Sequence, residues 1–267
     1  MTGAPSSKAV LVTGGTGGLG RAMARVLHAA GHRVIVCGRT AADLESITVE
    51  LPGVRAIHAD VSLDADRRAL MVAATADGLD VLVNNAAITR AHDYTSSFTL
   101  AEDRIRPELE TNFVAPVELT RLFLAWRRER GVDGRPATIA MVNTPGALFP
   151  LEANPLYCAT KAALRIFTAA LRRQLAVTPV DVVDIYPPAL DTGLARDLEV
   201  AGQAANGADV VAEVAELCVA GILAGDRIVL PHPSATMLVE RFAVDLDDAM
   251  LDQINAGVRR RPGWDAT

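Results

Sequence analysis

The chain has 267 residues, half of them hydrophobic, and its 26 basic and 32 acidic residues give a formal net charge of −6. This length allows one long domain or two short ones around a sizeable core. An acidic balance without a basic block argues against a nucleic-acid-binding protein. No stretch reaches the roughly 18 consecutive apolar residues of a membrane span.

The three cysteines, Cys37, Cys158 and Cys218, are odd in number and far apart. They form neither a metal-ligand spacing nor a disulfide framework. The first residues also lack the charged segment and long apolar run of a signal peptide. We therefore expect a soluble protein in the reducing cytoplasm, without a metal site.

The predicted elements alternate along the chain. After a flexible lead-in over residues 1–8, a strand is expected at 9–12, a helix at 21–30 and a second strand at 34–37. Further strands are predicted at 54–58, 81–83, 138–142, 180–185 and 227–230, and further helices at 63–76, 102–130 and 156–175. Near-continuous apolar strands between helices favour a doubly wound parallel α/β sheet with helices on both faces. The turn-rich segments 143–154 and 186–207 are expected to be active-site loops, in one domain over residues 1–267.

A glycine-rich stretch, Thr13–Gly20, follows the first strand and holds five glycines in seven residues. Glycines let backbone N–H groups approach a pyrophosphate, which the helix N-terminus then stabilises by its partial positive charge. The stretch fits TGxxxGxG through Gly14, Gly18 and Gly20, and equally TGxxGxxG through Gly17. Its place between a strand and a helix predicts a dinucleotide site rather than an ordinary turn.

The end of the second strand, Gly38-Arg39-Thr40, has no acidic residue before Asp43. An acidic residue there binds the ribose 2′-hydroxyl of NAD, whereas a cation accommodates the 2′-phosphate of NADP. Because a guanidinium can bind phosphate through two hydrogen bonds, we expect NADP(H) to be favoured over NAD(H). A solvated arginine, or one stacked on adenine, is the alternative.

Tyr157 and Lys161 are four residues apart in Tyr-Cys-Ala-Thr-Lys, so they share one face of a predicted helix. A neighbouring ammonium favours the phenolate, which predicts a tyrosine pKa below its usual ~10. Such a phenol can donate a proton to a carbonyl oxygen as hydride arrives, or remove it in reverse. Taken alone, the pair also fits a core tyrosine beside an exposed lysine.

Together these motifs resemble the compact, single-domain branch of the short-chain dehydrogenase/reductase family, from Ala9 to about Leu230. The matching segments, in order, are Thr13–Gly20, Asp60-Val61, Asn84–Ala87, Asn112, Tyr157 with Lys161, and Pro187–Thr192. The resemblance implies a Rossmann-type fold of about seven strands, a nicotinamide cofactor and a small-molecule carbonyl or alcohol substrate.

The resemblance also implies the residues that bind the cofactor. They are Gly14, Thr16, Gly18, Leu19, Gly20, Arg39, Thr40, Asp60, Val61, Asn85, Ala86, Tyr157, Lys161, Pro187, Ala189, Leu190 and Thr192. Asp60 would bond the adenine amino group with Val61 beside it, while Asn85 and Ala86 would lie along the adenosine ribose. Thr192 would reach the carboxamide or the pyrophosphate.

Four catalytic residues follow from the same resemblance. Tyr157 would be the general acid/base, and Lys161 would tune it and bind the nicotinamide ribose. Thr144 would donate a hydrogen bond to the substrate oxygen, and Asn112 would hold a water that connects Lys161 to solvent.

Three positions depart from the family pattern. Thr144 stands where serine is usual; its hydroxyl can donate the same bond, but its methyl group restricts χ1. Ala87 replaces a glycine, which matters only if φ is positive there. Pro188 replaces the glycine of the usual Pro-Gly and removes an N–H donor, so Ala189 or Leu190 must supply any backbone contact to the carboxamide.

The predicted substrate pocket is mostly apolar. Its residues are Pro145, Phe149, Leu151, Asn154 and Leu190, with a lid over residues 193–207. A moderately hydrophobic ketone or secondary alcohol is the expected substrate. Apolar residues on more than one face of segments 102–130 and 156–175 predict a homodimer or homotetramer. The tail over 242–267 is expected to be a terminal helix on a neighbour or a frayed end.

The leading hypothesis is an NADP(H)-dependent oxidoreductase that interconverts a ketone or aldehyde and an alcohol. Because a fold does not fix a function, two alternatives remain. One is a nucleotide-sensing or scaffold protein in which Thr144 and Pro188 weaken catalysis. The other is a non-redox biosynthetic enzyme, such as a dehydratase or cyclase.

Overall fold

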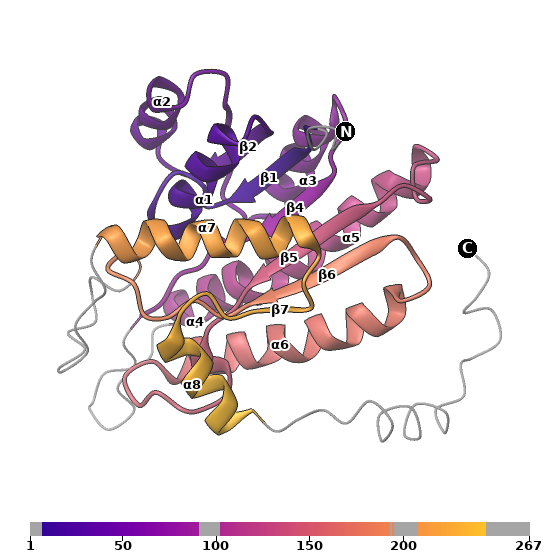
Figure 1. Ribbon diagram of the computed structural model, residues 1–267. Coiled ribbons are helices and arrows are strands. Elements are labelled where there is room, and N and C mark those ends of the chain that lie inside the picture. The colour runs from indigo at the N-terminus through magenta and orange to yellow at the C-terminus, as the bar shows by residue number, and fades with distance from the viewer. Residues whose placement is uncertain (1–6, 91–101, 193, 195–207, 244–267) are drawn as a thin grey trace, which may run out of the picture.

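The fold is a seven-stranded parallel sheet in the order β3-β2-β1-β4-β5-β6-β7 (Figure 1). The structure is a computed structural model, and it describes residues 7–90, 102–192, 194 and 208–243. The strands are β1 (Ala9–Thr13), β2 (Arg33–Gly38), β3 (Arg55–His58), β4 (Val81–Asn84), β5 (Ala137–Val142), β6 (Val180–Ile185) and β7 (Ile228–Val229). The predicted doubly wound, Rossmann-type sheet is confirmed.

Helices cover both faces of this sheet. They are α1 (Gly18–Ala29), α2 (Ala41–Glu50), α3 (Asp64–Thr75), α4 (Glu102–Leu109), α5 (Ala115–Glu129), α6 (Pro155–Leu175), α7 (Ala208–Ala224) and α8 (Pro233–Phe242). A π-helical turn, η1 (Glu110–Val114), joins α4 to α5, and a 3-10 turn, η2 (Pro145–Ala147), follows β5. In the described part of the chain, no helix is long and apolar enough to span a bilayer.

Two apolar cores lie on opposite faces of the sheet because successive strand residues point to opposite sides. Val10 and Val12 of β1 pack in the core that includes α1 and α7, whereas Leu11 packs in the core that includes α3, α5 and α6. All three are fully buried, and burying a side chain of this size contributes about 1.5–3 kcal/mol. This two-sided burial explains why the strands are almost continuously apolar.

Several predicted boundaries are wrong. The single helix expected over 102–130 is interrupted by η1, and helices α2, α7 and α8 were not predicted. The two described residues of the lead-in are tied to the loop before β2: Ser7 Oγ donates to Gly31 O at 2.9 Å, and Lys8 N donates to His32 Nδ1 at 3.1 Å. Most of the predicted lid, 193–207, and of the tail, 242–267, lies outside the described residues.

The strand order reverses between β1 and β4, which are neighbours in the sheet but distant in the chain. In open α/β sheets, ligands bind beyond the carboxyl ends of the strands at such a point. The glycine-rich stretch follows β1, and Thr144 follows β5. The fold therefore brings the predicted site residues to one edge of the sheet.

Candidate active site

The glycine-rich turn between β1 and α1 is too compact for side chains. Gly14 and Gly18 have φ of +62° and +50°, values that L-residues rarely adopt. A Cβ at Gly20 would lie 2.4 Å from the Gly14 carbonyl oxygen. The N-cap of α1 is Gly17, which has no side chain to accept from the first-turn N–H groups. These N–H groups and the helix dipole fit a pyrophosphate.

The segment after β4 holds this turn in place. Asn85 Nδ2 donates to Thr13 O at 2.8 Å, and Thr13 Oγ1 accepts from the N–H groups of Asn85 (2.9 Å) and Ala86 (3.0 Å). The Asn85 side chain thus stabilises the glycine-rich turn, where the resemblance had implied a place along the ribose. Ala87 does not have a positive φ, so its methyl group is accommodated without strain.

Arg39 and Thr40 are exposed at the carboxyl end of β2. The Thr16 side chain lies directly beside this strand end, because a Cβ at Gly38 would come within 2.6 Å of Thr16 Oγ1. The Arg39 carbonyl is bonded to His58 Nε2 at 2.9 Å, which fixes the backbone but not the guanidinium. A hydroxyl and a cation therefore share the corner predicted to meet the 2′-phosphate.

Asp60, which follows β3, is half-buried and held in a turn. Its Oδ1 accepts from Ser62 N (2.9 Å) and Ser62 Oγ (2.7 Å), and its own N–H donates to Asp66 Oδ2 (2.8 Å). The Val61 carbonyl accepts from Arg67 at 2.8 Å. These bonds give the segment a fixed shape on the adenine side of the predicted site.

Tyr157, Lys161 and Thr144 converge around the end of β5. Lys161 is buried on α6, and its Nζ donates to the Val142 carbonyl at 2.8 Å, two residues before Thr144. The same Nζ lies 5.8 Å from the centroid of the Tyr157 ring. Thr144 is half-buried and caps η2, with its Oγ1 accepting from Gly146 N at 3.3 Å.

Burial controls the ionisation of both α6 side chains. The pKa of Tyr157 is raised well above its usual value by burial, with smaller contributions from Cys158 and Glu108. The prediction of a Tyr157 pKa below its usual value is therefore wrong for the protein by itself, because burial is the largest cause of the shift and raises the pKa. Burial also lowers the pKa of Lys161 to about 8, against the opposing charge of Asp184.

Asn112 lies in the π-helical turn η1 and is fully buried. Its Oδ1 accepts from Ile88 N at 2.9 Å, while its Nδ2 donates to Ile88 O (2.8 Å) and Thr160 Oγ1 (3.2 Å). Thr160 immediately precedes Lys161. The amide group thus joins the segment after β4 to α6, and both of its N–H groups are already used. Oδ1 keeps a second lone pair, with which it could accept from the predicted water.

The predicted substrate residues lie in and around η2. Pro145 is buried, and Leu151 Cδ1 lies 3.4 Å from a Cβ position on Gly146. The Phe149 ring packs against Phe242, with centroids 4.9 Å apart. Sequence reasoning missed Phe242, because it lies at the end of a helix, α8, that was not predicted.

Asn154 and Leu190, the other two predicted pocket residues, each contact a neighbouring element. Asn154 is buried, and its Nδ2 donates to Thr89 Oγ1 at 3.1 Å, so it ties the start of α6 to the segment after β4. Leu190 packs against the core that contains α1 and α7.

The loop after β6 returns to the glycine-rich turn. Pro187 is buried and Ala189 is exposed. A Cβ at Gly18 would lie 3.0 Å from Thr192 Cβ. Thr192 therefore reaches the start of α1, as the prediction of a pyrophosphate contact requires.

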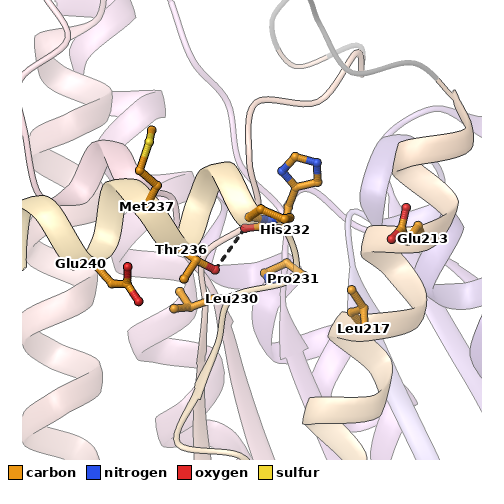
Figure 2. Close-up of a pocket in the computed structure, with 9 residues that line it drawn as sticks. Glu213, Leu217, Leu230, Pro231, His232, Thr236, Met237 and Glu240 are labelled. Atoms are coloured by element: carbon orange, nitrogen blue, oxygen red, sulfur yellow. Dashed lines mark hydrogen bonds between the residues drawn. The ribbon is translucent and has the colours of Figure 1, made fainter.

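A surface hollow of about 430 Å³ lies elsewhere, between α7 and α8 (Figure 2). His232 on its rim accepts from Ser234 N at 3.2 Å through Nδ1 and thereby caps α8. The predicted site residues that the structure describes do not line this hollow. Within the described residues, no group of three or more His, Cys, Asp or Glu side chains is placed to hold a metal ion.

Comparison with known proteins identifies the family. The family model described as short chain dehydrogenase matches residues 8–201. An uncharacterized oxidoreductase of Bacillus subtilis (strain 168), DltE, is 39% identical over 194 residues, covering 71% of this chain and 74% of that protein. The L-xylulose reductase of Homo sapiens is 30% identical over 192 residues, covering 72% and 75%.

Solved structures agree with this assignment. The 3-ketoacyl-(acyl-carrier-protein) reductase of Brucella melitensis, complexed with NADH, is 26% identical with a TM-score of 0.74, covering 84% of this chain and 95% of that one. A serine dehydrogenase complexed with NADP+ is 29% identical with a TM-score of 0.62, covering 70% and 74%. The chain is therefore a member of the short-chain dehydrogenase/reductase family, an oxidoreductase that acts on alcohol or carbonyl groups with a nicotinamide cofactor.

Proposed function

We propose that the protein is an NADP(H)-dependent oxidoreductase that interconverts a ketone or aldehyde and an alcohol, with Tyr157 as general acid/base. The observation that carries this proposal is the bond from Lys161 Nζ to the Val142 carbonyl at 2.8 Å. It fixes the ammonium next to Tyr157 and two residues from the Thr144 hydroxyl. A phenol, an ammonium and a hydroxyl are the groups that proton transfer to a carbonyl oxygen needs.

Each residue of the proposed site has a separate role in the reaction. When bound, the reduced nicotinamide supplies the hydride. Thr144 donates a hydrogen bond to the substrate oxygen, and Tyr157 donates the proton that this oxygen takes up. Lys161 holds positive charge beside the phenol and binds the nicotinamide ribose. Asn112 acts indirectly, by tying the segment after β4 to Thr160 on α6.

The buried Tyr157 phenol would be the proton donor in reduction. Burial raises its pKa, so the phenol carries its proton at neutral pH. In oxidation the same side chain would accept the alcohol proton after losing its own, which the Lys161 charge assists.

The preference for NADP(H) rests on the end of β2. Arg39 and Thr40 are exposed there, and Thr16 lies beside them. A guanidinium with a nearby hydroxyl suits a 2′-phosphate. The serine dehydrogenase in complex with NADP+ is consistent with this preference, whereas the reductase in complex with NADH shows that the family also accommodates the other cofactor.

The apolar surroundings of η2 suit a moderately hydrophobic substrate. The side chains here are apolar: Pro145, Phe149 and Leu151 lie in and around η2, and Phe242 from α8 adds a second aromatic ring. The polar group of Asn154 is directed to Thr89 instead. A ketone with an apolar substituent fits this lining.

We further propose that two copies pair through α5 and α6. Ile166 on α6 is 55% exposed, and Phe113 and Phe167 beside it form an edge-on pair 6.4 Å apart. Leu124 and Trp126 on α5 are likewise only partly buried, and an apolar surface shared by two helices is typical of an interface. Sedimentation of the wild type and of Ile166→Glu would test this pairing, because a monomeric wild type contradicts it.

The test of the activity is the consumption of reduced nicotinamide cofactor with a panel of apolar ketones. We expect turnover by the wild type and loss of turnover in Tyr157→Phe, with cofactor binding retained. Tight cofactor binding without turnover on any carbonyl, and no effect of Tyr157→Phe, would contradict the proposal and favour a sensing role.

A further inference from the structure

A carboxylate is buried directly behind the predicted catalytic residues. Asp184 on β6 is 4% exposed. Its Oδ2 accepts from the Tyr186 hydroxyl at 2.7 Å, and its Oδ1 accepts from Asn143 Nδ2 at 3.2 Å. A buried charge is costly unless it is hydrogen-bonded, and these two bonds offset part of that cost.

This carboxylate is connected to the catalytic side chains through one residue. Strands β5 and β6 pair in a register that places Met141 opposite Asp184. Asn143 then follows β5, and its N–H donates to Ile185 O at 2.7 Å. Asn143 lies between Val142, whose carbonyl accepts the Lys161 ammonium, and Thr144. The side chain that Asp184 holds, Asn143, thus lies between the residue that binds the Lys161 ammonium and the residue that carries the Thr144 hydroxyl.

The charges around Asp184 come from several elements. Helix α6 contributes Lys161, Arg165 and Arg172, and the end of β6 contributes the Tyr186 phenol. From β5 the neutral Asn143 faces it, and from the β7 side its N–H meets the Arg227 carbonyl at 3.2 Å.

The charge of Asp184 acts on Lys161 through space. Burial raises the pKa of Asp184 to about 6, while the bonds from Tyr186 and Asn143 lower it. Asp184 in turn raises the pKa of Lys161 against the effect of burial. The carboxylate therefore favours the charged form of the buried lysine.

We propose that Asp184 is a positioning residue of the site: it holds the turn at Asn143 and supplies a buried negative charge that favours the Lys161 ammonium. Its catalytic consequence rests on the proposed function, but its effect on Lys161 does not. Asp184 touches neither Tyr157 nor Thr144 in this role. It acts on the backbone and the charge that those residues depend on.

The composition of the chain allows a direct measurement. The sequence has two lysines, Lys8 and Lys161, so selective 13Cε labelling gives two resolvable NMR signals, with Lys161→Arg to assign them. In Asp184→Asn we expect the Lys161 titration midpoint to fall by about one pH unit, with Lys8 unchanged. The matched control is Asp181→Asn, an exposed carboxylate on the same strand. Equal Lys161 midpoints in the two variants would overturn the proposal.

A second measurement needs no substitution, in case Asp184→Asn does not fold. In the wild type, the Lys161 signal should show a smaller inflection near pH 6, where Asp184 takes up a proton. A single inflection between pH 5 and 10, at the Lys161 midpoint, would also overturn the proposal.

Turnover separates the two proposals. In Asp184→Asn we expect kcat to fall about tenfold, while the KM for cofactor changes little. The alkaline limb of the pH profile of kcat should move to lower pH. A wild type without turnover would defeat the proposed function, but the NMR result would still decide the role of Asp184. A shifted Lys161 midpoint with an unchanged pH profile of kcat would show that Asp184 does not act on the reaction.

Discussion

The side-chain amide of Asn112 pairs with the backbone of Ile88 through both of its polar atoms. Oδ1 accepts from Ile88 N at 2.9 Å, and Nδ2 donates to Ile88 O at 2.8 Å. This pair of bonds closes the segment after β4 onto the helix that carries Asn112. It gives that loop segment a partner on a rigid element, close to the residues proposed to react.

Replacement of Asn112 should therefore destabilise the fold as well as the site. In Asn112→Ala the N–H and carbonyl of Ile88 lose their partners, and we expect the free energy of unfolding to fall by about 2–4 kcal/mol. Urea denaturation measures this change. Glu129→Ala, at the exposed end of α5, is the control; equal stability of the two variants would contradict the role assigned to Asn112.

The glycine-rich turn before α1 offers a direct test of cofactor binding, with a glycine far from the site as its control. A Cβ at Gly20 would meet the Gly14 carbonyl at 2.4 Å, whereas a Cβ at Gly134, before β5, has no heavy atom of the described chain within 4 Å. We expect Gly20→Ala to weaken NADP(H) binding at least about tenfold and Gly134→Ala to leave it unchanged. Fluorescence titration gives both dissociation constants. Equal values would show that the turn does not cradle the cofactor.

Cofactor preference should follow Arg39. In Arg39→Asp a carboxylate replaces the cation that suits the 2′-phosphate, so the ratio of NADPH to NADH efficiency should fall at least about tenfold. Steady-state kinetics with each cofactor measure the ratio. Arg55→Asp makes the same charge change at the start of the neighbouring β3, and this control should keep the wild-type ratio of NADPH to NADH efficiency. An unchanged ratio in Arg39→Asp would refute this assignment.

The buried Lys161 predicts a specific pH dependence of stability. Its pKa is lowered from 10.5 to about 8 by burial, so between these values the unfolded state binds more protons and stability rises with pH. Below pH 8 the cost of the buried charge is fully present. Relative to Lys161→Met, the wild type should gain about 3 kcal/mol from pH 8 to 10.5. Denaturation of both proteins across this pH range measures the gain. A difference in unfolding free energy that does not change with pH would contradict the burial effect.

The aromatic pair of Phe149 and Phe242 should affect substrate binding more than chemistry. A pair with centroids 4.9 Å apart contributes about 0.5–1.5 kcal/mol beyond its buried area. In Phe242→Ala we expect the KM for an apolar ketone to rise about three- to tenfold, with kcat little changed. Met237→Ala, on the same helix and 56% exposed, is the control. A loss confined to kcat would place Phe242 outside the substrate pocket.

Much of the fold could be predicted because the pattern was unambiguous. Strands such as β1 and β5 are short, almost entirely apolar and bounded by turn residues, as expected in a sheet that is covered on both faces. Helix α7 was missed because its sequence, ADVVAEVAELCVAGILA, is rich in β-branched residues and apolar on several faces. Periodicity alone does not separate such a segment from a strand.

The site was predicted as a set of residues but not as an arrangement. Spacing gave Tyr157 and Lys161 a shared helix face, yet the ionisation of Tyr157 depends on burial, which only the packed structure shows. Asp184 and Asn143 are 41 residues apart in the chain. Strand register brings them together, and no local pattern contains that information.

The π-helical turn η1 sets the direction in which Asn112 points. A π turn closes i→i+5 bonds, whereas the flanking helices α4 and α5 close regular α-helical bonds. Removing one residue from 110–114 would restore regular bonding and rotate Asn112 away from Ile88. The irregularity of this helix is therefore what gives Asn112 its two bonds to the segment after β4.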